Sequence, residues 1–102
     1  MGDILAVLTD VKFPLGQVVA TCGVVQEMDT NLRFAGFVAR SLERHAAGDW
    51  GDLCEEDRQE NERALREGDR LFSAYQEEGL RKIWIITEWD RSATTILFPE
   101  EY

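Results

Sequence analysis

The sequence is poor in the residues and runs that define several common protein classes. It has two cysteines, one histidine and no CxxC pair among its 102 residues. A zinc site of four Cys or His ligands therefore cannot form within one chain, and we expect Cys22 and Cys54 to be buried or semi-buried free thiols. No apolar run approaches the roughly 18 to 20 residues of a membrane span. The opening MGDILAVLTD has acids where a signal peptide has lysine or arginine, so we expect a cytoplasmic protein without membrane contact.

Motifs for nucleotide and acyl chemistry are also absent. The chain has no P-loop, no GxGxxG and no GxSxG. The first two motifs supply glycine-rich loops that hold phosphates, and the third presents a nucleophilic serine on a strained turn. We therefore expect no cofactor, no metal and no serine hydrolase activity.

Basic residues are scarce relative to acidic ones. Eleven Lys and Arg stand against twenty Asp and Glu, which gives a net charge of −9. Such a surface repels phosphate backbones, so we expect no direct binding to duplex DNA. Hydrophobic residues still make up 44% of the chain, which is typical of a folded protein. The length predicts a single domain over residues 1–102.

The N-terminal half predicts extended chain followed by helices. Residues 3–21 read as extended with a turn at 13–16, and Gly23 indicates a change of direction before a short helix over 24–28. Over 31–47 the apolar residues recur with the period of an amphipathic helix, and Gly48 supplies its end. These apolar positions are Phe34, Phe37, Val38 and Leu42.

A second long helix is expected further along the chain. Asp52 lies three residues before Glu55, which is the spacing of a capping box, so we predict a helix over 52–67 that ends at Gly68. Its apolar content is thin, so it should cover one edge of the core.

The last third predicts an antiparallel meander with strands at 70–76, 82–89 and 93–98, ended by Pro99. The middle strand has bulky apolar residues on both faces and is expected to be central. The predicted fold is α+β: two to three helices packed on a C-terminal three-stranded antiparallel meander, to which an N-terminal strand can be added.

His45 supports two interpretations. It lies at the edge of the apolar stripe of the helix over 31–47, where a partly buried imidazole can interact with the C-terminal end of the helix dipole. Alternatively, His45, Glu88 and Arg91 are candidate catalytic residues, since an acid, a base and a phosphate-binding arginine form a metal-independent ribonuclease site. This set loosely resembles small nucleases of the barnase and RelE type, although the excess of acids opposes an RNA substrate.

The middle of the chain carries most of the negative charge. Residues 49–69 hold nine acids and three arginines. A helix of sixteen residues spans about 24 Å, and duplex DNA carries roughly fourteen charges over that length. The density of negative charge on this segment is therefore too low to mimic DNA. It is either a solvated helix face or a surface that docks on a basic protein. The candidate partner-binding residues are Asp49, Trp50, Asp52, Glu55, Glu56, Asp57 and Glu60.

Three aromatic residues are further candidates. Trp50 lies in a glycine-flanked loop, where its indole either anchors the loop over the core or contacts a partner. We favour the core position. Trp89 and Tyr102 complete the set.

Three stretches resemble a family of small bacterial proteins from plasmids and integrative elements. They are GDWGDL at 48–53, NExALxxG at 61–68 and KIWIITEWDRSATTILFPEEY at 82–102. The resemblance covers residues 13–102, and members commonly have alanine where Trp89 stands here. The family is loosely labelled plasmid-related protein or restriction-system subunit. Its setting implies a role in element maintenance or in blocking host defences such as restriction or CRISPR systems.

The sequence thus predicts a non-catalytic acidic interaction protein of a mobile element. A candidate role is inhibition of a host-defence system, in which the chain docks on a basic host-defence or element-maintenance protein. The alternatives are the small ribonuclease described above and an oligomerising scaffold. The sequence leaves the oligomeric state open.

Overall fold

In the part that the structure describes, the chain folds into one sheet and three α-helices. The computed structural model describes residues 11–102, so the predicted extended segment over 3–10 lies outside the described residues. The elements are β1 (Gln17–Ala20), α1 (Cys22–Thr30), α2 (Leu32–Ala46), α3 (Glu55–Glu67), β2 (Leu71–Tyr75), β3 (Ile83–Thr87), β4 (Ala93–Leu97) and the 3₁₀ turn η2 (Pro99–Glu101). The α+β class and the C-terminal meander are confirmed.

The sheet has four strands in the order β1-β4-β3-β2. β2 pairs with β3 and β3 with β4 in antiparallel fashion, as predicted. β1 pairs with β4 in parallel, with Gln17 opposite Ala93 and Ala20 opposite Ile96. The expectation of a purely antiparallel meander is therefore incomplete, because the N-terminal strand joins as a parallel neighbour.

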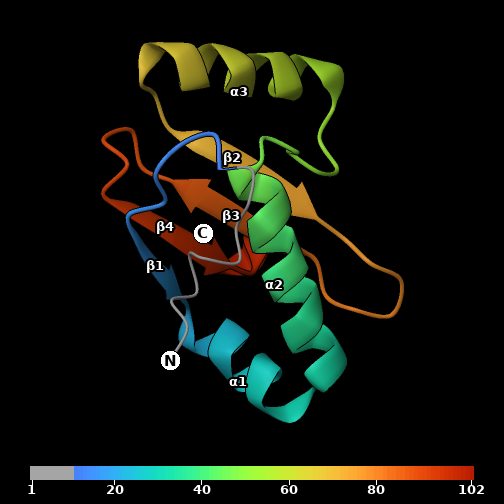
Figure 1. Cartoon of the computed structure of the whole chain (residues 1–102). Coiled ribbons are helices and arrows are strands. Elements are labelled where there is room, and N and C mark those ends of the chain that lie inside the picture. The colour runs from blue at the N-terminus through green and yellow to red at the C-terminus, as the bar shows by residue number, and fades with distance from the viewer. Residues whose placement is uncertain (1–10) are drawn as a thin grey trace.

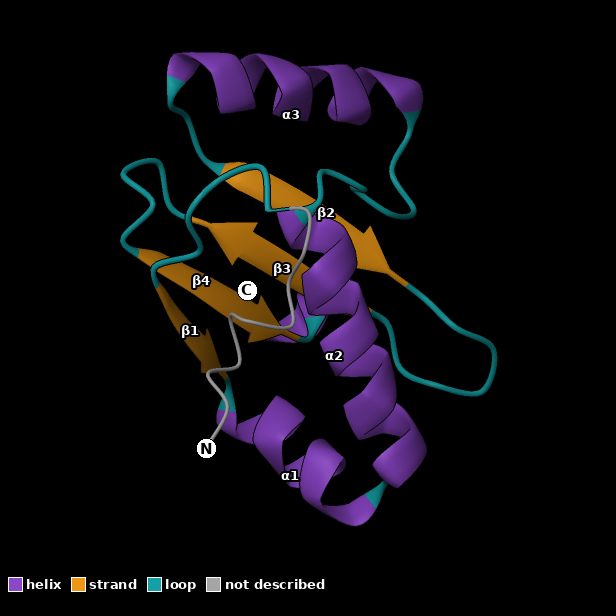
Figure 2. Ribbon diagram, in the orientation of Figure 1, coloured by secondary structure: helices purple, strands orange, loops and turns teal. Residues whose placement is uncertain are grey.

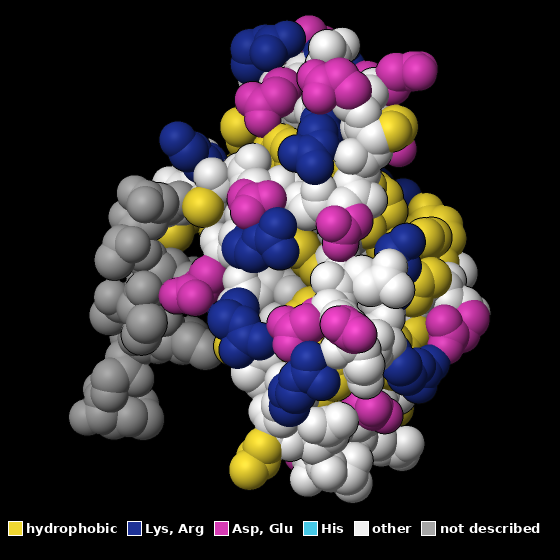
Figure 3. All heavy atoms as spheres, turned by 90° about the vertical axis from the view of Figure 1, so that its right-hand side faces the viewer, with side chains coloured by type: hydrophobic (Ala, Val, Ile, Leu, Met, Phe, Trp, Pro, Cys, Tyr) yellow, Lys and Arg dark blue, Asp and Glu magenta, His cyan; other side chains and the backbone are white. Residues whose placement is uncertain are grey.

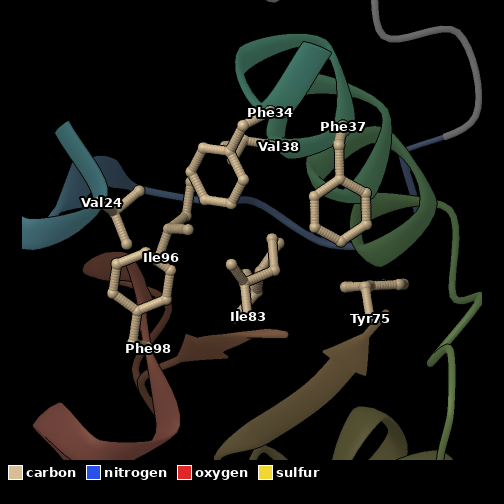
Figure 4. Close-up of a cluster of buried hydrophobic side chains, with 9 residues drawn as sticks. Val24, Phe34, Phe37, Val38, Tyr75, Ile83, Ile96 and Phe98 are labelled. Atoms are coloured by element: carbon tan, nitrogen blue, oxygen red, sulfur yellow. The ribbon is translucent and has the colours of Figure 1, made fainter. Parts of the chain in front are cut away.

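The helices lie on one face and at one edge of the sheet. α2 crosses one face, α1 lies below it on the same side, and α3 lies beyond the edge strand β2 (Figures 1 and 2). Phe34, Phe37 and Val38 of α2 point toward the sheet and pack on buried side chains of all its strands but β1 (Figure 4). This cluster forms the main core.

The helix over 31–47 is observed almost as predicted. The side chain of Asn31 accepts a hydrogen bond from the Phe34 amide at 3.1 Å and caps the start of α2. Gly48, with φ of 83°, follows its end in the left-handed conformation that glycine tolerates.

The prediction that Gly23 precedes a short helix is wrong. α1 begins at Cys22, with Thr21 as its N-cap, and Gly23 lies inside its first turn. A Cβ at Gly23 would meet the carboxylate of Glu101, which accepts a hydrogen bond from the Thr21 hydroxyl at 2.7 Å. Glycine is used here for a close approach between α1 and η2.

The helix predicted over 52–67 is observed and ends at Glu67 before Gly68, but the prediction that Asp52 caps its start is wrong. α3 begins at Glu55 with Cys54 as its N-cap residue. The carboxylate of Asp52 instead accepts a hydrogen bond from the Gln76 amide at 2.9 Å. A contact 24 residues away in the chain therefore replaces the local capping box.

The free edge of β2 is closed by α3. The amide group of Asn61 donates to the Phe72 carbonyl at 2.6 Å and accepts from the Phe72 amide at 3.1 Å. Asn61 thus replaces the backbone of a neighbouring strand and satisfies groups that an edge strand leaves open.

The loop before α3 continues this closure. The Ala74 amide donates to the Trp50 carbonyl at 3.3 Å, and the Asp52 amide donates to the Ala74 carbonyl at 2.7 Å. A Cβ at Gly51, which has φ of 79°, would collide with the Ala74 carbonyl oxygen, so this pairing requires glycine.

We expect Asn61→Leu to lower the free energy of unfolding by about 2 kcal/mol, because the polar groups of Phe72 lose both partners. The measurement is urea unfolding of the variant and of Gln59→Leu, a control at an exposed position of the same helix. The control should change stability by less than about 0.5 kcal/mol. An equally small change in Asn61→Leu would show that the edge contacts contribute little.

Candidate functional site

Most carboxylates of the acidic segment over 49–69 form hydrogen bonds or ion pairs within the fold. Asp49 accepts two hydrogen bonds from Arg44, at 2.7 and 3.2 Å, and these bonds hold the pKa of Asp49 below its usual range. Asp52 binds the Gln76 amide, as described above. Glu60 pairs with Arg63 at 2.5 Å, and its pKa is lowered chiefly by that hydrogen bond. Arg63 also bonds Glu67 and Asp69.

Three exposed carboxylates at the start of α3 form no ion pair within the described part of the chain, although Glu55 accepts a hydrogen bond from the Gln59 amide group at 3.3 Å. Glu55, Glu56 and Asp57 form the first turn of this helix and are exposed. Among residues 11–102, no lysine or arginine forms an ion pair with any of the three. Their negative charges face the positive end of the helix dipole, which stabilises them there without neutralising the surface. Acidic and basic side chains mingle over the face of the molecule that Figure 3 shows.

Trp50 belongs to the core, and its inclusion among the partner-binding residues is corrected. Its side chain is only 3% exposed and packs in a second hydrophobic cluster with Phe13, Leu71 and Ala64. The indole Nε1 donates to Glu62 at 2.8 Å. A partner therefore cannot contact this ring without opening the fold.

His45 is fully buried, so the expectation of a partly buried helix-end histidine is also corrected. Its Nδ1 lies 2.6 Å from the Ser73 hydroxyl, and its Nε2 lies 2.9 Å from the Thr87 hydroxyl. Thr87 in turn lies 2.7 Å from the Thr94 hydroxyl, which donates to the Leu15 carbonyl at 2.7 Å.

This chain of hydrogen bonds determines the tautomer of the imidazole. Because Thr94 donates to a carbonyl, it must accept from Thr87, and Thr87 must then accept from Nε2 of His45. Nε2 therefore carries the proton, and Nδ1 accepts from Ser73. Burial, assisted by the positive charge of Arg91, lowers the pKa of His45 to about 3. The neutral ring links α2 to β2 and β3.

The three candidate catalytic residues do not converge on one site. The Glu88 side chain is half-exposed, and its carboxylate lies 3.9 Å from the guanidinium of Arg70. Strand alternation places Glu88 on the opposite face of the sheet from Thr87 and His45. Arg91 donates to the backbone carbonyls of Asp69 at 2.6 Å and Ala64 at 3.2 Å, and so connects the end of α3 to the turn before β4. This geometry places the imidazole away from the surface and gives the ribonuclease alternative no support.

The cysteines differ from their expectation as well. Cys22 and Cys54 are free, as predicted, but both are exposed because they stand at the starts of α1 and α3. Across 11–102, no group of three His, Cys, Asp or Glu side chains is arranged to hold a metal ion. The helices of the same range are all too short or too polar to cross a bilayer.

Sequence reasoning missed the residues that surround His45. Ser73, Thr87 and Thr94 are polar residues at inward positions of strands that are otherwise apolar there. That break in the alternation was the signal for a buried polar network. Asn61 is a buried polar residue of α3 that binds the backbone of β2. A polar residue at an inward position of this helix was a similar signal.

Comparison with known proteins adds no relative to this picture. No protein-family model, no curated protein and no solved structure matches the chain.

Proposed function

We propose that this protein is a non-catalytic interaction protein that docks its acidic helix on a basic partner. The observation that supports this function is the group of three exposed carboxylates on Glu55, Glu56 and Asp57, none of which forms an ion pair with a lysine or arginine among residues 11–102. In a chain with a net charge of −9, these groups attract a cationic surface and speed its association.

The class of partner comes from the resemblance to proteins of plasmids and integrative elements. We propose a basic host-defence or element-maintenance protein, with inhibition of a restriction or CRISPR system as the role. The docking surface includes Glu55, Glu56 and Asp57, with the paired carboxylates Asp49 and Glu60 beside it. Asp52 binds backbone within the fold and contributes charge only.

A pull-down with neutralised variants tests the docking surface. Replacing Glu55 and Glu56 by Gln and Asp57 by Asn removes three negative charges and keeps the side-chain size. We expect recovery of a basic partner from host lysate to fall about tenfold, at roughly 0.5 kcal/mol per exposed ion pair, and to fall with added salt in the unmodified protein.

The matched control neutralises three exposed acids elsewhere. Asp29→Asn, Glu43→Gln and Glu78→Gln together give the same net charge from other elements. Recovery with this control should stay close to that of the unmodified protein. If both triple variants lose the partner equally, net charge alone attracts it and α3 is not the docking site.

Two activity assays separate the proposed role from its alternatives. Co-expression in a host with an active restriction or CRISPR system should raise the plating efficiency of invading DNA, and the neutralised variant should not. Incubation with RNA in the absence of metal should leave the RNA intact. Degradation that disappears in a folded His45→Ala variant would contradict the non-catalytic function.

A further inference from the structure

The face of the sheet opposite α1 and α2 is the feature that the proposed function leaves unused. Strand pairing places Phe72, Ile86, Thr95 and Val19 in one row across this face, and Ala74, Trp84 and Leu97 in the next. Within 11–102, α1 and α2 lie on the other face of the sheet and α3 lies beyond its edge (Figures 1 and 2). Ala74, Ile86 and Leu97 are buried, so the apolar surface that reaches solvent here comes from Phe72, Trp84, Val19 and Tyr102. An antiparallel sheet with one solvated face has polar residues there, whereas this face is largely apolar.

The face contains a hollow with aromatic walls. Its volume is about 220 Å³, and Arg70, Phe72, Trp84, Ile86 and Tyr102 line it. The rings of Phe72 and Trp84 meet edge to face at 5.0 Å, and Tyr102 packs on Trp84 at 5.7 Å. Tyr102 is 69% exposed and Val19 is 39% exposed. Hydrophobic side chains gather at the right-hand edge of Figure 3, with charged ones around them.

The charges of Arg70 and Glu88 beside the hollow cancel. Arg70 lies 3.9 Å from Glu88 and donates to the Tyr102 hydroxyl at 2.8 Å, and both charged side chains remain half-exposed. One base and one acid therefore flank the hollow in a chain whose net charge is −9. A basic partner finds no excess of negative charge here and is attracted to α3 instead.

We infer that a second copy of this chain binds here, sheet against sheet, about a two-fold axis. In a two-fold interface both copies use the same surface, so a residue of one copy can contact a residue that neighbours it on the other copy. Arg70 of one copy can therefore pair with Glu88 of the other. Repulsion between two copies that each carry −9 is weakest where the facing surfaces are neutral. The aromatic walls of both hollows are then buried together.

The size of the face predicts a weak dimer. Four strands spaced about 4.8 Å apart, each of four or five residues at about 3.3 Å, give roughly 300 Å² in projection for each copy. This face is smaller than the roughly 800 Å² per partner of a standard specific interface, so we expect a weak, transient dimer with a dissociation constant of about 10 to 100 μM. The dimer leaves α3 outside and is independent of the proposed function.

Sedimentation equilibrium of the unmodified chain from about 5 to 500 μM tests the dimer. We expect the mass to rise from 11.7 kDa toward twice that value. Tyr102→Ala combined with Val19→Lys should stay monomeric, with unchanged far-UV circular dichroism because both side chains are exposed. The control Leu32→Ser removes an 88% exposed apolar side chain of α2 and should still dimerise.

A mixing experiment tests the pairing itself. Arg70→Glu and Glu88→Arg each place like charges on the face, and each alone should dimerise about tenfold more weakly. An equimolar mixture of the two variants should form a heterodimer close to the unmodified affinity. The inference is overturned if the unmodified chain stays monomeric at 500 μM, if the Tyr102 and Val19 variant still dimerises, or if mixing restores nothing. A monomer that binds another protein through Tyr102 would likewise overturn it.

Discussion

Lowering the pH from 7.5 to 5 is expected to reduce the free energy of unfolding by about 2 kcal/mol through His45 alone. The folded chain holds the pKa of this imidazole at about 3, against an ordinary value of 6.5. Between these two values the unfolded chain binds more protons, so stability is full above pH 6.5 and is lost as the pH falls toward 3.

Between pH 6.5 and 5 the loss of stability comes from His45. It is the only histidine in the sequence, and the ordinary pKa values of aspartate and glutamate side chains lie below pH 5. Asp49 and Glu101 have lowered pKa values, chiefly from hydrogen bonds with Arg44 and Thr21, so their contribution is lost only at lower pH.

Urea unfolding at pH 7.5, 6.5, 5.5 and 5 measures the slope. His45→Gln should be less stable at every pH but flat above pH 5, because it has no imidazole to titrate. The matched control is Val38→Ala, which disturbs the buried packing of the same helix and keeps His45, so its slope should equal that of the unmodified chain. An unmodified chain without a slope would show that the imidazole is protonated or accessible in the folded state.

The second large effect is expected from Trp50→Ala, which should cost about 3 to 5 kcal/mol. Trp50 fills the cluster between α2 and α3, stacks with Phe13 at a centroid distance of 6.2 Å, and contacts the His45 ring edge to face at 5.9 Å. Its removal leaves a large cavity in a chain whose total stability is about 5 to 15 kcal/mol.

Two milder variants separate the parts of this contribution. Trp50→Phe keeps a ring but loses the Nε1 hydrogen bond to Glu62, and should cost about 1 to 2 kcal/mol. Trp89→Ala removes an exposed indole and should change stability by less than about 0.5 kcal/mol. Urea unfolding gives all three values. A Trp50→Ala cost below about 1 kcal/mol would contradict the core position of the indole.

Patterns that act along the chain predicted the elements well. The period of Phe34, Phe37, Val38 and Leu42 placed α2 to within one residue of each end, because a helix depends on neighbours three and four residues away. The strands of the meander followed for the same reason, since alternation and turns are local.

Contacts between distant residues explain the errors. Asp52 has the spacing of a capping residue, but the Gln76 amide competes for its carboxylate, and the sequence does not show which contact is closer in space. The parallel pairing of β1 with β4 joins segments that the whole helical region separates. His45 lay at the edge of an apolar stripe, and the hydroxyls that bind it come from β2 and β3. Its role therefore depended on the assembled sheet.

The closure of β2 by Asn61 and the Gly51 loop limits how this protein can aggregate. A fibre that grows by adding strands consumes two open edges per molecule, one to receive the previous copy and one to offer the next. A molecule in which one sheet edge is permanently covered can end such a fibre but cannot be one of its internal subunits. Ordered polymerisation would first require α3 to detach, so conditions that melt this helix should mark the onset of fibrillation.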